Sequence, residues 1–206
     1  AEADTYLRLA AGSDCHNNTL LIEDGGTVAV DGYPFLGRYG TNNRVRVIGG
    51  DLAIASWAQL GTTGGADGNI MQVTTGSAVE IGGDFEIGVE GANNRLEVDG
   101  GTVTVDGRLS ISPAGEPGNR VRVGADGLLT ASNAVVGAGA ALALDGGALQ
   151  AADGLQVDGG ALLEGSGSIA GDTLVAGRLS PGLSPGVLCH TGSLTFARER
   201  ALALAE

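Results

Sequence analysis

The sequence predicts an all-β fold, a single-stranded right-handed parallel β-helix, on the strength of three observations. An Asn recurs at intervals of 25, 26, 25 and 25 residues. Three short apolar-alternating segments follow it in each period. Glycine is abundant, with 38 residues, while aromatic residues make up only 3%. A fixed period of roughly 20–50 residues is typical of repeat architectures, and three strands per period of about 25 residues indicate a β-solenoid. The recurring residues are Asn18, Asn43, Asn69, Asn94 and Asn119.

Each period is expected to form three strands in a fixed order. The first two alternate apolar and polar residues, as half-buried strands do, and a glycine turn joins them. The third is shorter and ends at a small residue. The first strands point Leu20/Ile22, Val45/Val47, Met71/Val73, Leu96/Val98 and Val121/Val123 inward. The second strands point Val28/Val30, Leu52/Ile54, Val79/Ile81, Val103/Val105 and Leu129/Ala131 inward. The third strands end at Leu36-Gly37, Leu60-Gly61, Ile87-Gly88, Ile111-Ser112 and Val136-Gly137.

The repeat divides the chain into three regions. Residues 1–13 lie outside it and are expected to form an N-terminal cap with a strand at 6–10. Residues 14–137 hold the regular rungs, each advancing the axis by about 4.8 Å, with right-handed crossovers. Residues 138–206 repeat at shorter intervals, contain a doubled Ser-Pro-Gly motif, and end in a tail from residue 197. The tail's composition suits either a strand or a short helical cap.

Charge and composition exclude several functions. The formal net charge is −13 and the isoelectric point about 4.3, which argues against nucleic-acid binding and against adhesion to an anionic membrane. No run approaches the ~20 apolar residues of a membrane span, so no membrane insertion is expected. All 11 basic residues are Arg, which excludes lysine Schiff-base chemistry within this segment.

One segment carries a family resemblance. Residues 177–188 read GRLSPGLSPGVL and residues 192–196 read GSLTF. This resembles the LSPG-x-SPG-x-L element of autotransporter-associated β-strand repeats, which occur in passenger regions of bacterial autotransporters and related exported surface proteins. The Asn-Asn and Gly-Gly-Thr-Val units, clearest at residues 93–105, resemble the degenerate repeats of large bacterial surface adhesins. The resemblance covers residues 14–204 and implies a right-handed β-helix that is secreted or displayed at the cell surface.

A structural function is therefore favoured: an adhesin stalk, an extracellular matrix component or a filament subunit. Open solenoid ends carry unpaired strand edges, so head-to-tail self-association is expected. An enzyme acting on polysaccharides, a lyase or a hydrolase, is the less favoured alternative. The strand-face carboxylates Glu80, Asp84, Glu86 and Glu97 form no evident stacked pair beside a basic partner. The short loops also provide no walls for a deep cleft.

Two columns of like residues stand out. The recurring Asn is expected to occupy a rung corner, to accept left-handed backbone geometry and to pass hydrogen bonds along the stack. An outward stripe of Arg on the first strands is interpreted either as a solvated face with salt bridges or as a docking strip. The docking partner would be an acidic polysaccharide, a host-cell surface or the acidic face of another copy. The stripe consists of Arg44, Arg46, Arg95, Arg120 and Arg122.

The two cysteines lie near opposite ends of the predicted rod. Cys15 and Cys189, each followed by His, are expected to be roughly 30–40 Å apart, whereas a disulfide needs Cα atoms within about 7 Å. They are interpreted as free, partly buried thiols, or as partners in a disulfide between subunits stacked head to tail. A metal site built from the two Cys-His pairs at such a junction is a third interpretation. No cofactor is expected, although Ca²⁺ binding at the Asp-Gly turns stays open.

Overall fold

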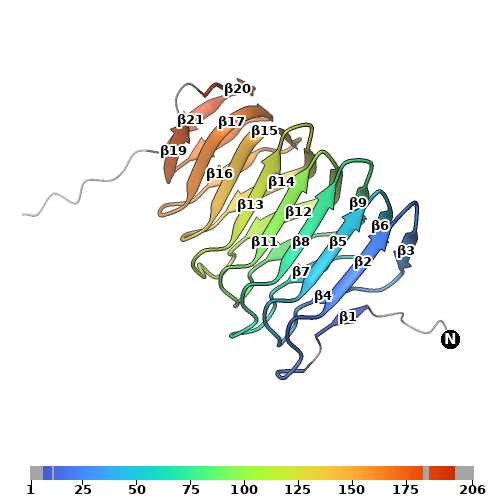
Figure 1. The fold of residues 1–206 in the computed structure, drawn as a ribbon. Coiled ribbons are helices and arrows are strands. Elements are labelled where there is room, and N and C mark those ends of the chain that lie inside the picture. The colour runs from blue at the N-terminus through green and yellow to red at the C-terminus, as the bar shows by residue number, and fades with distance from the viewer. Residues whose placement is uncertain (1–6, 11, 183–185, 198–206) are drawn as a thin grey trace, which may run out of the picture.

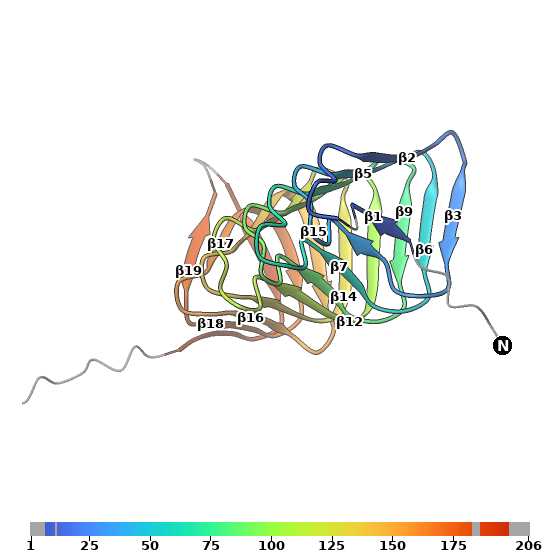
Figure 2. The ribbon, with the colours of Figure 1, turned by 90° about the horizontal axis from the view of Figure 1, so that it is seen from below.

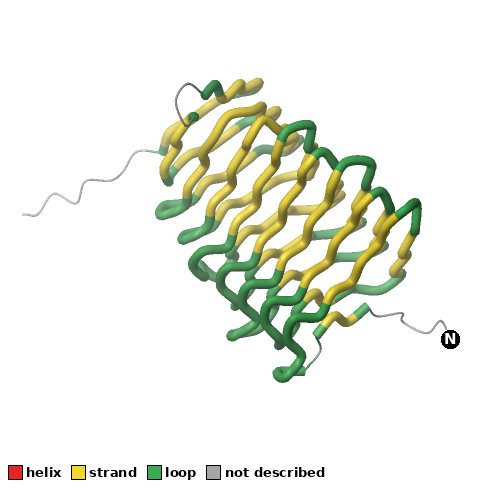
Figure 3. Tube along the Cα trace, viewed as in Figure 1, coloured by secondary structure: helices red, strands yellow, loops and turns green. Residues whose placement is uncertain are grey.

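The computed structural model describes residues 7–10, 12–182 and 186–197, and within these it is all-β, without a helix. Parallel strands stack in about eight turns as a parallel β-helix, as the sequence predicts (Figure 1). The turns of the chain line the corners of the stack, as Figure 3 shows. The described residues contain no helix that is long and apolar enough to cross a membrane.

The strands form three faces along the axis, and four long strands bend around a corner to serve two faces. The strands of neighbouring rungs pair in parallel, as β3, β6 and β9 do in Figure 2. Face 1 contains β2 (Thr19–Glu23), β5 (Arg44–Ile48), β8 (Ile70–Thr74), β11 (Arg95–Asp99), β13 (Arg120–Gly124), the first parts of β15 (Ala141–Ala151) and β17 (Leu162–Ala170), and β19 (Arg178–Pro181).

The other two faces follow in the same way. Face 2 contains β3 (Thr27–Val30), β6 (Asp51–Ile54), β9 (Ala78–Ile81), the first parts of β12 (Thr102–Ile111) and β14 (Leu128–Val136), the second parts of β15 and β17, and β20 (Leu188–Thr191). Face 3 contains β1 (Arg8–Leu9), β4 (Phe35–Leu36), β7 (Ala58–Leu60), β10 (Phe85–Ile87), the second parts of β12 and β14, β16 (Leu155–Val157), β18 (Thr173–Val175) and β21 (Leu194–Phe196).

The predicted inward residues form one narrow aliphatic core. Val45, for example, pairs with Leu20 on one side and Met71 on the other. The inward residues of the regular rungs are almost fully buried, and stacking one rung on the next buries both. Leu20 and Val28 are only half-buried because they belong to the first rung.

The rungs shorten toward the C-terminus, as the sequence predicts. On face 1 the strands starting at Arg95, Arg120, Ala141, Leu162 and Arg178 are 25, 21, 21 and 16 residues apart. The loop between faces 1 and 2 is lost, and β15 and β17 pass from face 1 to face 2 as continuous strands with an irregularity between Asp145 and Ala148.

The chain ends match the prediction only in part. The expected strand at 6–10 is shorter, because β1 covers Arg8–Leu9 alone and pairs with β4 on face 3. Residue 6 lies outside the described residues. So do residues 183–185 of the doubled Ser-Pro-Gly motif and residues 198–206 of the tail.

Candidate functional surfaces

The recurring Asn residues form a hydrogen-bonded ladder inside the solenoid. Each of the first four donates from its backbone N, at 2.8–3.0 Å, and from Nδ2, at 2.9–3.2 Å, to Oδ1 of the Asn one rung on. From Asn43 to Asn119 the side chains are at most 1% exposed. The ladder ends where Nδ2 of Asn119 donates to Ser112 Oγ and to the carbonyl oxygens of Gly91 and Glu116. This column is structural and offers no ligand surface.

One detail of the Asn prediction is wrong. The left-handed backbone belongs to the residue before each ladder Asn, not to the Asn itself. The left-handed positions are Asn17, Asn42, Gly68, Asn93 and Gly118, with φ between 57° and 75°. This left-handed residue turns the chain at the corner, and the ladder Asn that follows directs its side chain into the interior.

The glycines that end the first three of the third strands make room for this ladder. A Cβ added to Gly37, Gly61 or Gly88 would lie 2.1–2.3 Å from the nearest side-chain atom of Asn69, Asn94 or Asn119. These glycines also have φ of 67–76°. Both the close approach and the backbone conformation favour glycine.

The Arg stripe occupies the outer side of face 1 with the predicted register. Arg44 pairs with Ile70, which pairs with Arg95, which pairs with Arg120. In the parallel column, Arg46 pairs with Gln72, then Glu97, then Arg122. The structure therefore places all five Arg residues on one face, although polar and apolar residues interrupt both columns.

Ion pairs divide this stripe into two halves. Arg120 contacts Glu164 at 2.6 Å, and Arg122 contacts Asp145 at 2.6 Å and Asp99 at 3.1 Å. Hydrogen bonds to Asp145 and Asp99 raise the pKa of the Arg122 guanidinium above its ordinary value. Arg44, Arg46 and Arg95 are exposed, and among the described residues none of them forms an ion pair. The free positive charge of the stripe lies toward its N-terminal end.

Both cysteines are free thiols, and both are exposed rather than partly buried as expected. Cys15 precedes face 1, in the corner where the Gly40 Cα approaches its carbonyl. Cys189 lies on face 2 and pairs with Ser168. Following that register back through the rungs leads to Thr27. A copy stacked in register would therefore bring its Thr27, not its Cys15, next to Cys189, so the intersubunit disulfide and the Cys-His metal site require a rotated junction.

The four strand-face carboxylates considered in the sequence analysis lie on three different faces. Glu97 belongs to face 1 and Glu80 to face 2, whereas Asp84 and Glu86 share face 3. No group of three His, Cys, Asp or Glu side chains in the described part of the chain is placed to hold a metal ion. Only face 3 thus brings two of these carboxylates together.

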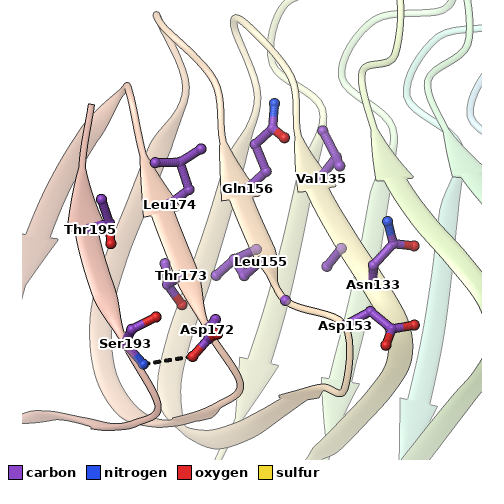
Figure 4. A pocket seen from close by; sticks show the side chains of 12 residues that line it. Asn133, Val135, Asp153, Leu155, Gln156, Asp172, Thr173, Leu174, Ser193 and Thr195 are labelled. Carbon is purple, nitrogen blue, oxygen red and sulfur yellow. Dashed lines mark hydrogen bonds between the residues drawn. The ribbon is translucent and has the colours of Figure 1, made fainter. Parts of the chain in front are cut away.

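The outer side of face 3 also carries two shallow grooves that the sequence reasoning missed. One, of about 340 Å³, runs across the last rungs (Figure 4). Asn133 of β14 lines it together with Asp153, Asp172 and Ser193, which lie just before β16, β18 and β21, and Val135, Gln156, Leu174 and Thr195 point outward into it. In it, the Ser193 backbone N donates to Asp172 Oδ1 at 2.7 Å, and this bond lowers the pKa of the Asp172 carboxyl from its ordinary value.

The other groove, of about 520 Å³, lies between the second and third rungs and includes Trp57. A signal for it existed in the sequence. Tyr33 and Trp57 stand at the same point of successive periods in a chain with a single Trp.

Among the described residues, no strand covers the core at the last rung. Leu194 and Phe196 pair with Thr173 and Val175, which are at most 2% exposed, and so occupy inward positions. They are nevertheless 43% and 59% exposed. His190 also sits inward, opposite Ile169, and its Nε2 lies 2.9 Å from Thr173 Oγ1. Among the described strands, β19, β20 and β21 each pair on one side only.

Comparison with protein-family models, curated proteins and solved structures found no match.

Proposed function

We propose that this chain is a structural subunit of an exported bacterial surface or matrix assembly, and that it associates end to end into filaments. The observation that carries the proposal is the last described rung, where Leu194 and Phe196 occupy core positions that no described strand covers. An apolar end with unpaired strand edges is a template for another strand layer. The resemblance to autotransporter-type repeats supports the exported location.

The polarity of the strands favours a head-to-tail contact. All rungs are parallel, so continuing the stack in parallel requires the N-terminal end of a second copy. There, Leu20 and Val28 are inward but half-buried, so the first rung is also incompletely covered. A contact between two different ends does not close on itself, and its repetition gives a filament.

The register within one chain supports a specific head-to-tail contact. Followed rung by rung along face 3, the column of Phe196 ends at Leu36 of β4 and then Leu9 of β1. In a continuous stack, β21 of one copy would take the place that β1 occupies beside β4 of the next. The two segments are alike, since Leu7-Arg8-Leu9 and Leu194-Thr195-Phe196 both place a polar residue between two apolar ones. In this arrangement β1 covers the edge of β4 in the free monomer, and β21 of another copy displaces it.

Sedimentation velocity over a concentration series tests this assembly. The wild-type chain should associate increasingly with concentration, and Phe196→Glu should weaken association at least about tenfold, since a charge would be buried at the junction. Leu174→Glu is the matched control, because Leu174 is 42% exposed but points outward one rung below. A wild-type chain that stays monomeric, or two variants that behave alike, would contradict the proposal.

A second candidate function is the binding of acidic polysaccharide along face 1. It is favoured by the exposed Arg44, Arg46 and Arg95, which have no ion-pair partner among the described residues. Such binding would weaken with salt, as screened surface charges do. Retention on an immobilised polyuronate should fall for Arg95→Glu and hold for Arg178→Glu, which lies on the same face beyond the stripe. Equal retention of both variants would count against the strip.

A further inference from the structure

The described aromatic side chains, scarce elsewhere, gather on the outside of face 3 at its N-terminal end. The Tyr33 and Trp57 rings stack at 4.8 Å with an interplanar angle of 7°, and Phe35 meets the Trp57 ring edge-on at 5.6 Å. The Arg38 guanidinium lies 4.5 Å above Phe35. Phe35 shares the outward column of Gln59, yet it is only 7% exposed because these neighbours cover it. The cluster is therefore a rigid apolar platform outside the solenoid core.

The stack of rings stops at Trp57. The register places Asp84 at the equivalent position of the third rung, since Ala58 pairs with Phe85. The Tyr33–Trp57 centroid distance of 4.8 Å equals the rung spacing of about 4.8 Å, so the two rings stack from one rung to the next. Tyr33 covers one side of the indole, and Trp57 also lines a groove together with residues of the third rung.

A groove of about 520 Å³ opens at this point. Trp57, Gln59, Asp84 and Glu86 line it, together with the small residues 55–56 and 82–83. A Cβ on Gly82 would come within 2.6 Å of the Ala55 carbonyl oxygen, and one on Gly83 within 3.0 Å of the Trp57 backbone N. Glycine lets these two corners pack closely without side chains that would fill the groove.

Hydrogen bonds hold the polar side chains of the groove in place, and each carboxylate keeps one oxygen that can accept a further hydrogen bond. Gln59 Nε2 donates to Glu86 Oε2 at 2.6 Å, and the Arg108 backbone N donates to Asp84 Oδ1 at 2.8 Å. Asp84 Oδ2 and Glu86 Oε1 accept no hydrogen bond from any described residue. Two oriented carboxylate oxygens beside an amide thus stand next to an aromatic ring.

We infer that this groove, the Trp57 groove, binds a neutral carbohydrate. The C–H groups of a pyranose ring pack on the open side of the indole, and its hydroxyls donate to the oxygens of Asp84 and Glu86 in charge-assisted hydrogen bonds. The two negative charges disfavour an acidic sugar. A cage for a quaternary ammonium needs several aromatic walls, whereas here one ring side is open. The site is separate from the Arg stripe on face 1 and does not depend on filament assembly.

The single Trp makes the site directly observable, because Trp57 is the only indole in the chain. Titration with neutral tetrasaccharides (cello-, malto-, xylo- and chitotetraose) should change its fluorescence for at least one of them. Calorimetry with that sugar should show about tenfold weaker binding for Trp57→Ala and several-fold weaker binding for Glu86→Gln. Gln156→Ala, in the other groove of face 3, is the matched control and should bind as the wild type does.

Four results would overturn the inference. They are no binding of any neutral tetrasaccharide at millimolar concentration, binding that Trp57→Ala leaves unchanged, tighter binding of tetragalacturonate, or tighter binding of tetramethylammonium. Circular dichroism of each variant separates a lost site from a lost fold. The outer side of face 3 is exposed in a monomer and in a filament alike. Sedimentation measures association and calorimetry measures sugar binding, so the two proposals can fail independently of each other.

Discussion

Single Asn residues hold neighbouring rungs together at one corner. Within the ladder, Oδ1 of Asn94 accepts both the backbone N and the Nδ2 of Asn69, in a site without solvent. Asn94→Ala leaves buried donors unpaired and should lower the free energy of unfolding by about 3 kcal/mol. Asn18→Ala removes only one donor at the exposed start of the ladder and should cost about 0.5 kcal/mol or less. Urea denaturation measures both, and equal losses would refute a cooperative buried ladder.

The glycine at the end of a third strand should be intolerant of any side chain. Gly61 has φ of +73°, and an added Cβ would lie 2.3 Å from Asn94 Nδ2. Gly49 has φ of +68° with nothing within 4 Å. Gly49→Ala should therefore cost only the left-handed conformation, about 1 kcal/mol, whereas Gly61→Ala should cost about 3 kcal/mol or more as the ladder shifts. Similar melting temperatures for the two variants would show that the close approach is unimportant.

The residue pattern predicted which side chains point inward but not which residues bend the backbone. Alternation assigns Val45 and Val47 to the core because period 2 leaves no other choice. The prediction places the left-handed conformation at the ladder Asn, whereas the residue before it, such as Asn42 or Gly68, adopts that conformation. Asn and Gly both tolerate it, so adjacent Asn residues such as Asn42 and Asn43 could not be told apart by type alone.

Among the elements, β21 is anchored at its start by one carboxylate. Asp172 Oδ1 accepts the Ser193 backbone N–H, which lowers the pKa of the carboxyl from its ordinary value. A lowered folded-state pKa stabilises the fold above the unfolded pKa, and this contribution is lost as the pH falls through the folded value. Exchange of the Ser193 amide hydrogen, corrected for intrinsic rates, should thus speed up below about pH 4. Asp172→Asn keeps the acceptor and should remove that step, and a step that persists would contradict this role.

At the N-terminal end, β1 should limit assembly. It is a two-residue strand, and its half-buried Leu9 sits beside Leu36, where Phe196 of another copy would lie. Leu9→Asp weakens β1 by placing a charge against the core. It should therefore increase end-to-end association in sedimentation experiments, whereas Leu21→Asp, an exposed outward position on β2, should not. Reduced association of Leu9→Asp would contradict displacement of β1.

The elements were predictable where the repeat is regular and less so at the ends. Five rungs repeat at nearly the same interval in the sequence, so the strands identified in one rung support those identified in the next. The fit between β1 and β21 appears only once the register of face 3 is known, because the two segments lie almost the whole chain apart.

For the whole molecule, the sequence located the Arg stripe but not the grooves of face 3. Five Arg residues on corresponding strands can be read as a column directly from the period. The Trp57 groove instead combines Trp57, Asp84 and Glu86 from two rungs with glycines that keep it open. Their proximity depends on how the corners pack, which periodicity does not specify.

Negative-stain electron microscopy of the purified full chain tests the central claim, that the solenoid continues from copy to copy through its open end. The account predicts unbranched fibres one molecule wide, unchanged by reductant because the register does not align Cys15 with Cys189. Phe196→Glu should leave isolated rods about 40 Å long, as expected for about eight rungs at about 4.8 Å each. Isolated rods of the wild-type chain at every concentration would contradict it.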